Sequence, residues 1–244
     1  MLRSLMENNP GKGGKKRKRN FWLYSMGEFV LIFLGILIAL QVDNWNQRRQ
    51  DRKLEKILLS EMRSNLKATQ DDIEYDIRMQ ELFLNSTRVA LDFLQSDSPW
   101  HDSLGWHFTR IMAGTLFDNN NSAYESLKSI GIDLVRNDSL RQQISLVYEV
   151  RYPKVDATQD ILFTHILDHL YPALRANLKT VSPREMTVPL NLEELRQNNG
   201  FAEDLYMTIF IYNLSIQTYE RALEETIKLI YYITEELGLK PGDF

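Results

Sequence analysis

Cysteine is absent from the 244-residue sequence, which excludes disulfide frameworks and thiolate metal sites but does not decide the cellular compartment. Proline and glycine are scarce, at 7 and 11 residues, and neither occurs between Ile36 and Leu94. No segment keeps the alternation of polar and apolar residues that marks a half-buried strand, and no internal repeat is present. We therefore expect an all-α protein.

The sequence also lacks the common catalytic motifs. It contains no G-x-S-x-G nucleophile elbow, no Walker loop and no dinucleotide-binding fingerprint. Hydrophobic residues make up 43% and charged residues 25% of the chain, shares that fit one moderate globular domain in addition to an anchor. We expect no enzymatic activity and no cofactor.

One long apolar run is present near the N-terminus: Phe21–Val42 reads FWLYSMGEFVLIFLGILIALQV. At about 1.5 Å per residue it makes a helix of about 33 Å, enough to cross a hydrocarbon core of about 30 Å. Trp22 and Tyr24 lie at one end and Trp45 lies beyond the other, where amphipathic rings favour the headgroup layer. Residues 21–45 are therefore predicted to form a transmembrane helix with these aromatic residues as interface anchors and the lipid bilayer as partner.

Charge is divided unevenly along the chain. Residues 1–20 carry seven Lys/Arg and one Glu, a net charge of +6, whereas the rest carries 22 Lys/Arg and 32 Asp/Glu, a net −10. The acidic remainder argues against nucleic-acid binding, and a basic tail directly before a span is typical of an orientation signal that also touches anionic lipid. The positive-inside rule places the N-terminus in the cytoplasm and the bulk outside it, with a modest bias because cations also follow the span: Arg48, Arg49, Arg52, Lys53 and Lys56.

A cleaved signal peptide is the alternative to an anchor. Its apolar core would be shorter, and a small-x-small cleavage site should follow it. Ala39–Asp43, at the end of the apolar run, offers no such site. The anchor is therefore the preferred interpretation.

Glu28 lies inside the predicted span, about 10 Å from its cytoplasmic end. An ionisable group at this depth costs a few kcal/mol unless it is paired or protonated. Three interpretations stay open: the side chain reaches the interface, it forms a hydrogen bond across a helix dimer, or it carries proton or ion chemistry. Gly35 and Ala39, at small-xxx-small spacing, favour helix association and with it a homo-oligomer or a membrane-protein partner.

Beyond the span, the helix is expected to continue through residues 46–95 as a stalk and first bundle helix. Residues 96–138 are predicted to be irregular with short helices, one of them at 122–130. A calcium loop at Asp118–Asn121 is a less favoured alternative there, because the alternating ligands and the distal Glu of such loops are missing. The helix at 46–95 carries an apolar stripe at helical spacing: Leu54, Leu58, Met62, Leu66, Ile73, Ile77 and Leu84.

Residues 139–240 are predicted to supply the remaining helices of an antiparallel bundle. One runs from about 137 to 176 with a kink at Pro153 unless it restarts there, a short turn follows at 192–197, and the last helix spans about 201–237. The last helix carries the clearest pattern, ten positions spaced alternately by four and three, which is typical of a bundle or coiled-coil seam. These positions are Leu205, Ile209, Tyr212, Ile216, Tyr219, Leu223, Thr226, Ile230, Ile233 and Leu237.

The best candidate for metal chemistry is the segment His165–His169, HILDH, which is similar to the H-x-x-E-H zinc signature with Asp168 in the place of Glu. Two His one turn apart can bind a metal from one helix face. On a helical wheel, however, His169 falls at the margin of the apolar face, whereas His165 and Asp168 fall toward solvent, and no third ligand is evident. A surface position is the preferred interpretation, and a metal site is the alternative.

A second pair of histidines, His101 and His107, lies among Trp100 and Trp106 in the irregular segment. A mixed aromatic and histidine patch can bind ligands. It is more often a loop that packs against its own domain, and we expect the latter here.

The anchor resembles a known family. Ser25–Asn46 reads SMGEFVLIFLGILIALQVDNWN, and it is similar to the start of a family of uncharacterised bacterial single-pass membrane proteins. Those proteins share a Gly-Glu start, a Gly-Ile-Leu-Ile-Ala-Leu-Gln middle and an Asn-Trp-Asn exit followed by a basic helix. Arg48–Glu55 fits that continuation, and Ala123–Gly131 (AYESLKSIG) resembles a second shared segment. The resemblance implies a single-pass bacterial membrane protein and assigns no catalytic residue.

Together these patterns predict a protein anchored in the bacterial inner (cytoplasmic) membrane whose extracytoplasmic helical bundle acts as a sensor, scaffold or assembly partner. Two other functions stay open. One is a subunit of a proton- or ion-coupled membrane complex that uses Glu28, and the other is a membrane-tethered metal-dependent hydrolase that uses His165 and His169.

Overall fold

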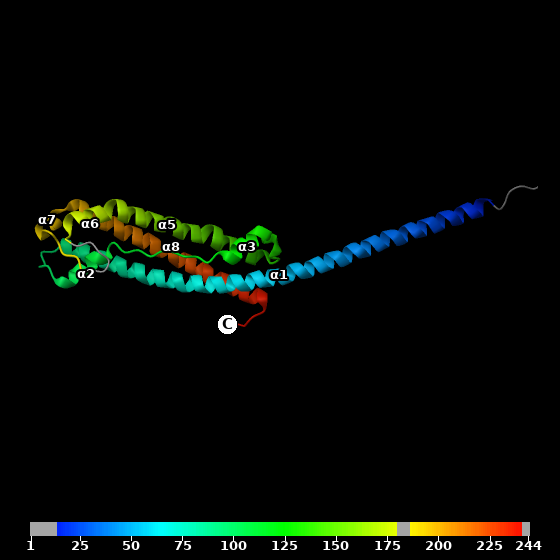
Figure 1. Cartoon of the computed structure of the whole chain (residues 1–244), viewed down its shortest axis with the longest axis horizontal. Coiled ribbons are helices and arrows are strands. Elements are labelled where there is room, and N and C mark those ends of the chain that lie inside the picture. The colour runs from blue at the N-terminus through cyan, green and yellow to red at the C-terminus, as the bar shows by residue number, and fades with distance from the viewer. Residues whose placement is uncertain (1–13, 180–185, 241–244) are drawn as a thin grey trace, which may run out of the picture. The chain divides into compact units, whose positions relative to one another are not determined.

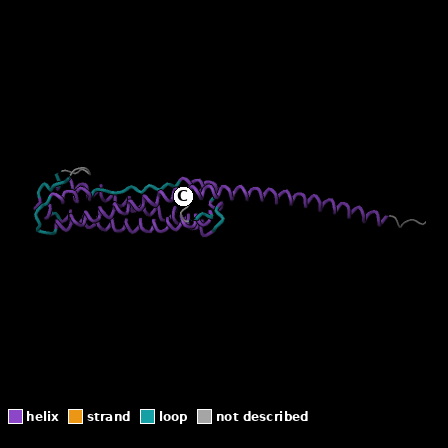
Figure 2. The backbone as a smooth tube through the Cα atoms, turned by 90° about the horizontal axis from the view of Figure 1, so that it is seen from below, coloured by secondary structure: helices purple, strands orange, loops and turns teal. Residues whose placement is uncertain are grey.

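A computed structural model describes residues 14–179 and 186–240, with side chains from residue 26 onward. The described residues form helices and loops and no strand, apart from an isolated backbone bridge between Leu178 and Pro189 (Figures 1 and 2). The all-α prediction is confirmed.

The chain divides into two units, Met1–Leu54 and Glu55–Phe244, which are described separately. The described part of the first unit is a single stretch of helix. The second unit contains the remaining elements. In chain order the helices are α1 (Gly14–Leu94), α2 (Asp102–Arg110), α3 (Ser122–Ile130), the 3₁₀ turn η1 (Ile132–Leu134), α4 (Asp138–Ser145), the π turn η2 (Leu146–Arg151), α5 (Tyr152–His165), the π turn η3 (Ile166–Leu170), α6 (Tyr171–Asn177), α7 (Leu192–Gln197) and α8 (Asn199–Leu237).

The second unit is built on residues 55–94 of α1, on α8, and on the continuous helical rod that α4, η2, α5, η3 and α6 form (Figure 1). Arg63 Nε donates to Thr234 Oγ1 at 2.9 Å, and Arg88 Nη2 donates to Asn213 Oδ1 at 3.3 Å. Residue numbers rise along α1 as they fall along α8, so these two helices are antiparallel.

The rod is also antiparallel to α8, because its residues Tyr152 and His165 form hydrogen bonds with Thr226 and Thr208 respectively. The rod and α1 therefore point the same way, which requires the chain to return along the bundle between them. It returns in the extended segment 113–121, which runs beside the helices (Figures 1 and 2). The predicted antiparallel bundle is thus confirmed, with α8 as the helix that opposes the other two.

Most of the apolar stripe predicted on α1 is buried. Leu58, Met62, Leu66, Ile73 and Leu84 are buried as predicted, whereas Leu54 is 37% exposed. One series of buried positions also follows a heptad spacing, and polar residues fill many of its positions, which an apolar pattern alone could not show. The series, spaced alternately by four and three, is Glu55, Leu59, Met62, Leu66, Thr69, Ile73, Asp76, Gln80, Phe83, Thr87, Ala90 and Leu94.

Half of the seam positions predicted on α8 belong to the observed buried seam, and half do not. Five predicted positions are core, but the other five lie on its flank, and Ile216 is the only one of these that is buried. Small side chains such as Ser215 and Ala222 occupy the core instead, since they let neighbouring backbones approach closely while larger aliphatic groups cover the flank. The observed seam is Phe201, Leu205, Thr208, Tyr212, Ser215, Tyr219, Ala222, Thr226, Leu229 and Ile233.

Each π turn of the rod directly precedes a proline. The amide of Tyr152 bonds to the carbonyl of Val147, five residues back, and Pro153 follows. The η3 turn ends in the same way before Pro172. A proline lacks an N–H and clashes with the carbonyl four residues earlier, and the wider π turn removes this conflict. The kink expected at Pro153 is therefore a π turn within a continuous rod.

Short elements follow local capping rules. The predicted helix at 122–130 is confirmed as α3, and the turn at 192–197 is confirmed as α7. Asn191 caps α7 through bonds from two backbone amides, whereas Asn121, directly before α3, makes no side-chain capping bond. Gly238 ends α8 at a φ of +70°, a left-handed conformation that glycine adopts without strain.

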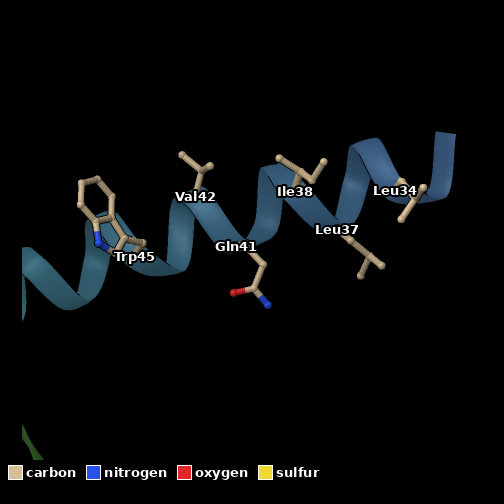
Figure 3. A pocket seen from close by; sticks show the side chains of 6 residues that line it. All are labelled: Leu34, Leu37, Ile38, Gln41, Val42 and Trp45. Atoms are coloured by element: carbon tan, nitrogen blue, oxygen red, sulfur yellow. The ribbon is translucent and has the colours of Figure 1, made fainter. Parts of the chain in front are cut away.

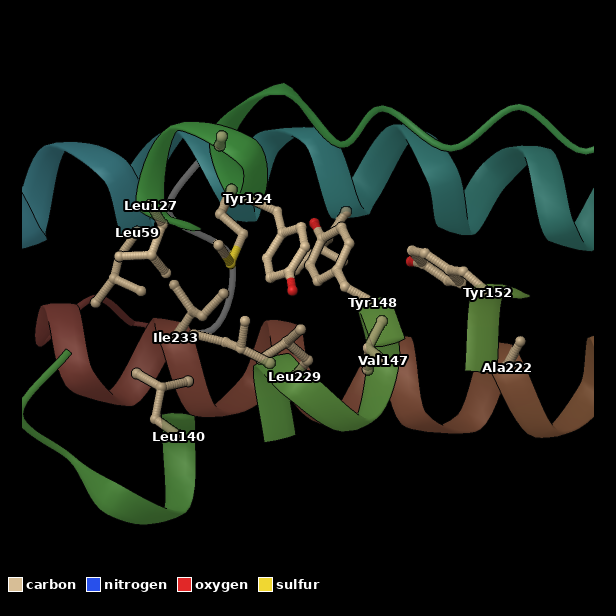
Figure 4. Close-up of a cluster of buried hydrophobic side chains, with 14 of the residues drawn as sticks. Leu59, Tyr124, Leu127, Leu140, Val147, Tyr148, Tyr152, Ala222, Leu229 and Ile233 are labelled. Atoms are coloured by element: carbon tan, nitrogen blue, oxygen red, sulfur yellow. The ribbon is translucent and has the colours of Figure 1, made fainter. Parts of the chain in front are cut away.

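Two apolar clusters fill the second unit. The Tyr124 core gathers α3 and α4 with the start of the bundle part of α1 and the end of α8 (Figure 4). Inside it the rings of Tyr124 and Tyr148 stack with centroids 4.4 Å apart. The Phe108 core gathers α2, α6 and α7 with the opposite ends of the same long helices. Ile77 packs against both clusters, so the middle of the bundle lies around it.

Candidate functional site

The first candidate site is the apolar part of α1. Among the described residues, one helix is long and apolar enough to cross a membrane, and none of its most apolar stretch is buried. Phe29, Leu31 and Ile38 expose 70%, 71% and 63% of their surfaces. A helix in contact with water normally keeps one polar face, and an apolar surface all round indicates an apolar surrounding. This part of the chain is suited to lipid.

Of the three predicted interface anchors, only the side chain of Trp45 lies in the described part of the chain. The indole of Trp45 is 63% exposed, and the guanidinium carbon of Arg49 lies 6.0 Å from the centre of the Trp45 ring. Trp22 and Tyr24 belong to α1, but their side chains lie outside the described residues. Figure 3 shows Leu34 and Gln41 among side chains that frame a shallow groove, which is surface relief on one helix.

The polar members of the span are exposed on the helix surface. Glu28 has no buried neighbour, and a Cβ added to Gly35 would meet no atom within 4 Å. Gly35 and Ala39 lie one turn apart on one face, so the surface is free for another helix. The structure places these residues as the association prediction requires, and the prediction itself stays untested.

The second candidate site is a buried polar layer around the middle of the bundle. Asp76 and Gln80, one turn apart on α1, are 5% and 1% exposed. Gln80 Nε2 donates to Thr115 Oγ1 of the extended segment at 3.4 Å. Tyr219 of α8 is 1% exposed, and its hydroxyl lies near Asp76 but outside ordinary hydrogen-bond geometry. Segments far apart in sequence thus contribute polar groups to one place.

The layer contains polar atoms that lack a partner. Gln80 Oε1 and Ser215 Oγ are buried and have no hydrogen bond. Unpaired buried polar atoms are costly and are rare in native proteins. Burial raises the pKa of Asp76 to about 6, and the nearby carboxylate of Asp72 adds to the rise, while the hydroxyls of Thr115 and Tyr219 oppose it. The carboxyl of Asp76 therefore changes charge in a mildly acidic range.

Other ionisable groups face this layer from α5 and α8. Burial raises the pKa of the Tyr219 hydroxyl, and the charges of Asp76 and Asp156 raise it further. Burial also raises the pKa of Asp156, with a contribution from Asp160. Two carboxylates, Asp76 and Asp156, thus act on the Tyr219 hydroxyl. Protonation of Asp76 would remove one of these negative charges.

The chain belongs to the family of unknown function DUF6090. The family model matches residues 28–174, which begin at Glu28 in the span and end in α6. This confirms the predicted resemblance to an uncharacterised family. No curated protein and no solved structure matches the chain.

The DUF6090 region contains only one side of the polar layer. Asp76, Gln80 and Thr115 lie inside residues 28–174, whereas Ser215 and Tyr219 lie in α8, beyond it. The layer was not predicted from the sequence. The signal that could have found it is the heptad register of α1, since extending that register from Met62 and Leu66 by fours and threes leads to Asp76 and Gln80.

The predicted position of His165 toward solvent is wrong, whereas the surface positions of Asp168 and His169 are confirmed. His165 is 7% exposed, and its Nε2–H points to Thr208 Oγ1 at 2.9 Å and to the carbonyl of Asp204 at 3.2 Å. His169 is exposed. The wheel assumed 100° per residue through residue 174, but the η3 turn begins at Ile166. The apolar positions before and after the turn therefore do not share one face, and a face averaged over both sides misplaced His165 and Leu167.

This arrangement gives little support to a metal site. The ring centres of His165 and His169 are 5.6 Å apart. The ring nitrogen of His165 that faces α8 is occupied by hydrogen bonds. Among residues 26–179 and 186–240, no group of three or more His, Cys, Asp or Glu side chains could hold a metal ion.

The predicted patch of aromatic and histidine residues packs against its own domain only in part, because His101 and Trp106 are exposed. His101 caps α2, because its Nδ1 accepts from the amide of Ser103 at 3.3 Å. His107 Nδ1 lies 3.3 Å from Ser86 Oγ, and burial with the nearby Arg110 lowers the pKa of His107. Trp100 packs its ring 5.6 Å from those of Phe93 and Phe108.

The segment Asp118–Asn121 behaves as a loop and cap. Asn120 Oδ1 accepts bonds from the amide and the hydroxyl of Ser122 at the start of α3.

Proposed function

We propose that this DUF6090 protein is a single-pass membrane protein whose anchor is the apolar part of α1 and whose helical bundle acts as a sensor, scaffold or assembly partner in the bacterial envelope. The observation that carries the proposal is the helix around Phe29–Leu40, which is apolar on all sides and buried on none. About 20 apolar residues are the length that a bilayer requires.

The proposed orientation puts the N-terminus in the cytoplasm and the bundle on the other side of the membrane. Its support is the charge of the tail, +6 over residues 1–20, directly before the span. The acidic remainder of the chain is compatible with translocation, since Asp and Glu contribute little to orientation.

Of the three roles, the polar layer favours a sensor. A carboxyl that changes charge inside a bundle couples the packing of several segments to an external condition. Asp76 on α1 and Tyr219 on α8 provide such a coupling. We propose no catalytic role, because His165 is used in packing and the region described offers no cluster of metal ligands.

We also propose self-association of the anchor through Gly35 and Ala39. Their shared face gives another helix close access, which favours van der Waals packing in lipid. Glu28 on a neighbouring copy would then gain a hydrogen-bond partner within the membrane. Cross-linking in membranes at native expression level should trap a dimer or larger species, whereas monomer alone would count against the oligomer.

Membrane fractionation combined with intact-mass measurement tests the anchor. The protein should stay in the membrane pellet after alkaline carbonate washing, and its mass should include residues 21–45. A protein that has lost this segment would identify a cleaved signal sequence. A full-length protein in the soluble fraction would refute the anchor itself.

A further inference from the structure

The segment that follows the span separates its charges by helix face. α1 is helical throughout residues 43–54. At 100° per residue, Trp45, Arg48, Arg49, Arg52 and Lys53 fall within an arc of about 140°. Asp43 and Asp51 fall outside that arc. We call the five residues in the arc the basic face.

Two contacts within the helix involve these residues. Gln47 Nε2 donates to Asp51 Oδ1 at 2.8 Å, outside the arc of the basic face. The guanidinium of Arg49 lies over the exposed indole of Trp45 at 6.0 Å. An indole and a cation on one face suit the boundary between acyl chains and headgroups.

The distances along the helix also fit a headgroup layer. Arg48 lies about 9 Å beyond Val42 and Lys53 about 16 Å beyond it. The headgroup region adds about 5–8 Å on each side of the hydrocarbon core, and long basic side chains reach back along the helix by several ångströms. Transmembrane helices tilt by about 20° on average, which would bring one face of this segment closer to the lipid.

We propose that the basic face binds the phosphate groups of anionic phospholipids and thereby sets the direction in which the anchor helix tilts. The proposal rests on the proposed function, since the face must emerge from a membrane. Charge complementarity identifies the lipid class: four cations with no carboxylate in the arc favour an anionic headgroup over a zwitterionic one.

The test uses the full-length protein in phosphatidylcholine vesicles that contain a trace of spin-labelled lipid. Electron spin resonance gives the relative association of labelled phosphatidylglycerol and labelled phosphatidylcholine with the protein. A matched variant moves two cations to the opposite face without changing composition or net charge: Gln47→Arg, Arg48→Gln, Gln50→Arg and Arg52→Gln.

Each cation at an anionic surface contributes about fivefold in affinity. The wild-type protein should prefer phosphatidylglycerol, and the face-swapped variant should lose about fivefold or more of that preference, although the basic tail is the same in both. Equal preference in the two proteins, or none in either, would overturn the proposal. Flotation of both proteins with the vesicles distinguishes failure of this proposal from failure of the proposed anchor. A protein that does not float would refute the anchor, whereas two proteins that float with equal lipid preference would refute only the basic face.

Discussion

The imidazole of His165 donates from Nε2 to Thr208 Oγ1 at 2.9 Å, and this bond joins α5 to α8 inside the bundle. Thr208 in turn donates from its hydroxyl to the carbonyl of Asp204 at 2.7 Å. A histidine that looked like a surface metal ligand in the sequence is therefore part of the packing between two long helices.

Replacing His165 should affect stability and leave metal content unchanged. His165→Ala removes a buried ring and the hydrogen bond that Thr208 Oγ1 accepts from it, so we expect the free energy of unfolding to fall by about 1–3 kcal/mol. Chemical denaturation followed by tryptophan fluorescence measures this loss. The exposed His169→Ala should change stability by less than about 0.5 kcal/mol. Stoichiometric zinc in the wild type that disappears in His165→Ala would contradict this account.

Asp76 should make the bundle less stable as the pH rises. Burial raises the pKa of Asp76 from 3.8 to about 6, so the folded state binds more protons than the unfolded state between these values. The stability that the neutral carboxyl provides is fully present below about pH 4 and is lost as the pH rises through about 6. The variant Asp76→Asn should therefore raise the free energy of unfolding at pH 8 by about 1–3 kcal/mol and reduce its dependence on pH.

A neighbouring carboxylate supplies the control for that experiment. Asp71 is exposed on the same helix, and Asp71→Asn should shift stability by no more than about 0.5 kcal/mol with the pH dependence unchanged. If Asp76→Asn and Asp71→Asn gave the same pH profile as the wild type, the polar layer would not respond to protons.

The register of α8 can be tested at two residues of the same helix turn, one buried and one exposed. Ala222 is fully buried in the seam, whereas Glu220 of the same helix is exposed. Ala222→Leu should overpack the core and cost about 1–3 kcal/mol, and Glu220→Leu should be close to neutral. Thermal unfolding in detergent distinguishes the two. A tolerated leucine at 222 would favour the register predicted from the sequence, with Leu223 at the centre.

The element boundaries could be predicted well because hydrophobic periodicity and capping residues are local signals. The helix at 122–130 ends at Gly131, the last helix ends at Gly238, and the turn predicted at 192–197 is confirmed. The polar core positions could not be found by looking for apolar residues, since Asp76 and Gln80 look like surface residues in isolation. Only the tertiary contacts of the extended segment and α8 bury them.

For the candidate sites too, features with a local sequence signal could be predicted, and features that depend on neighbouring segments could not. The long apolar helix around Glu28 could be predicted from composition alone, but its neighbours in a membrane cannot be read from one chain. His165 is misplaced because a uniform wheel has no π turns, and η3 follows directly after it. A proline that appears to interrupt a helix, as Pro153 and Pro172 do, is the sequence signal that could have warned of this.

The central claim is that the apolar helix of residues 21–45 belongs in lipid, and size-exclusion chromatography of the full-length protein after detergent removal tests it most directly. We expect the protein to aggregate unless vesicles are supplied, because the large side chains around Phe29–Leu40 are exposed on every side. A variant with Leu34→Arg and Ile38→Arg should fail to float with vesicles. A monodisperse, fully soluble wild-type monomer in detergent-free buffer would contradict the account.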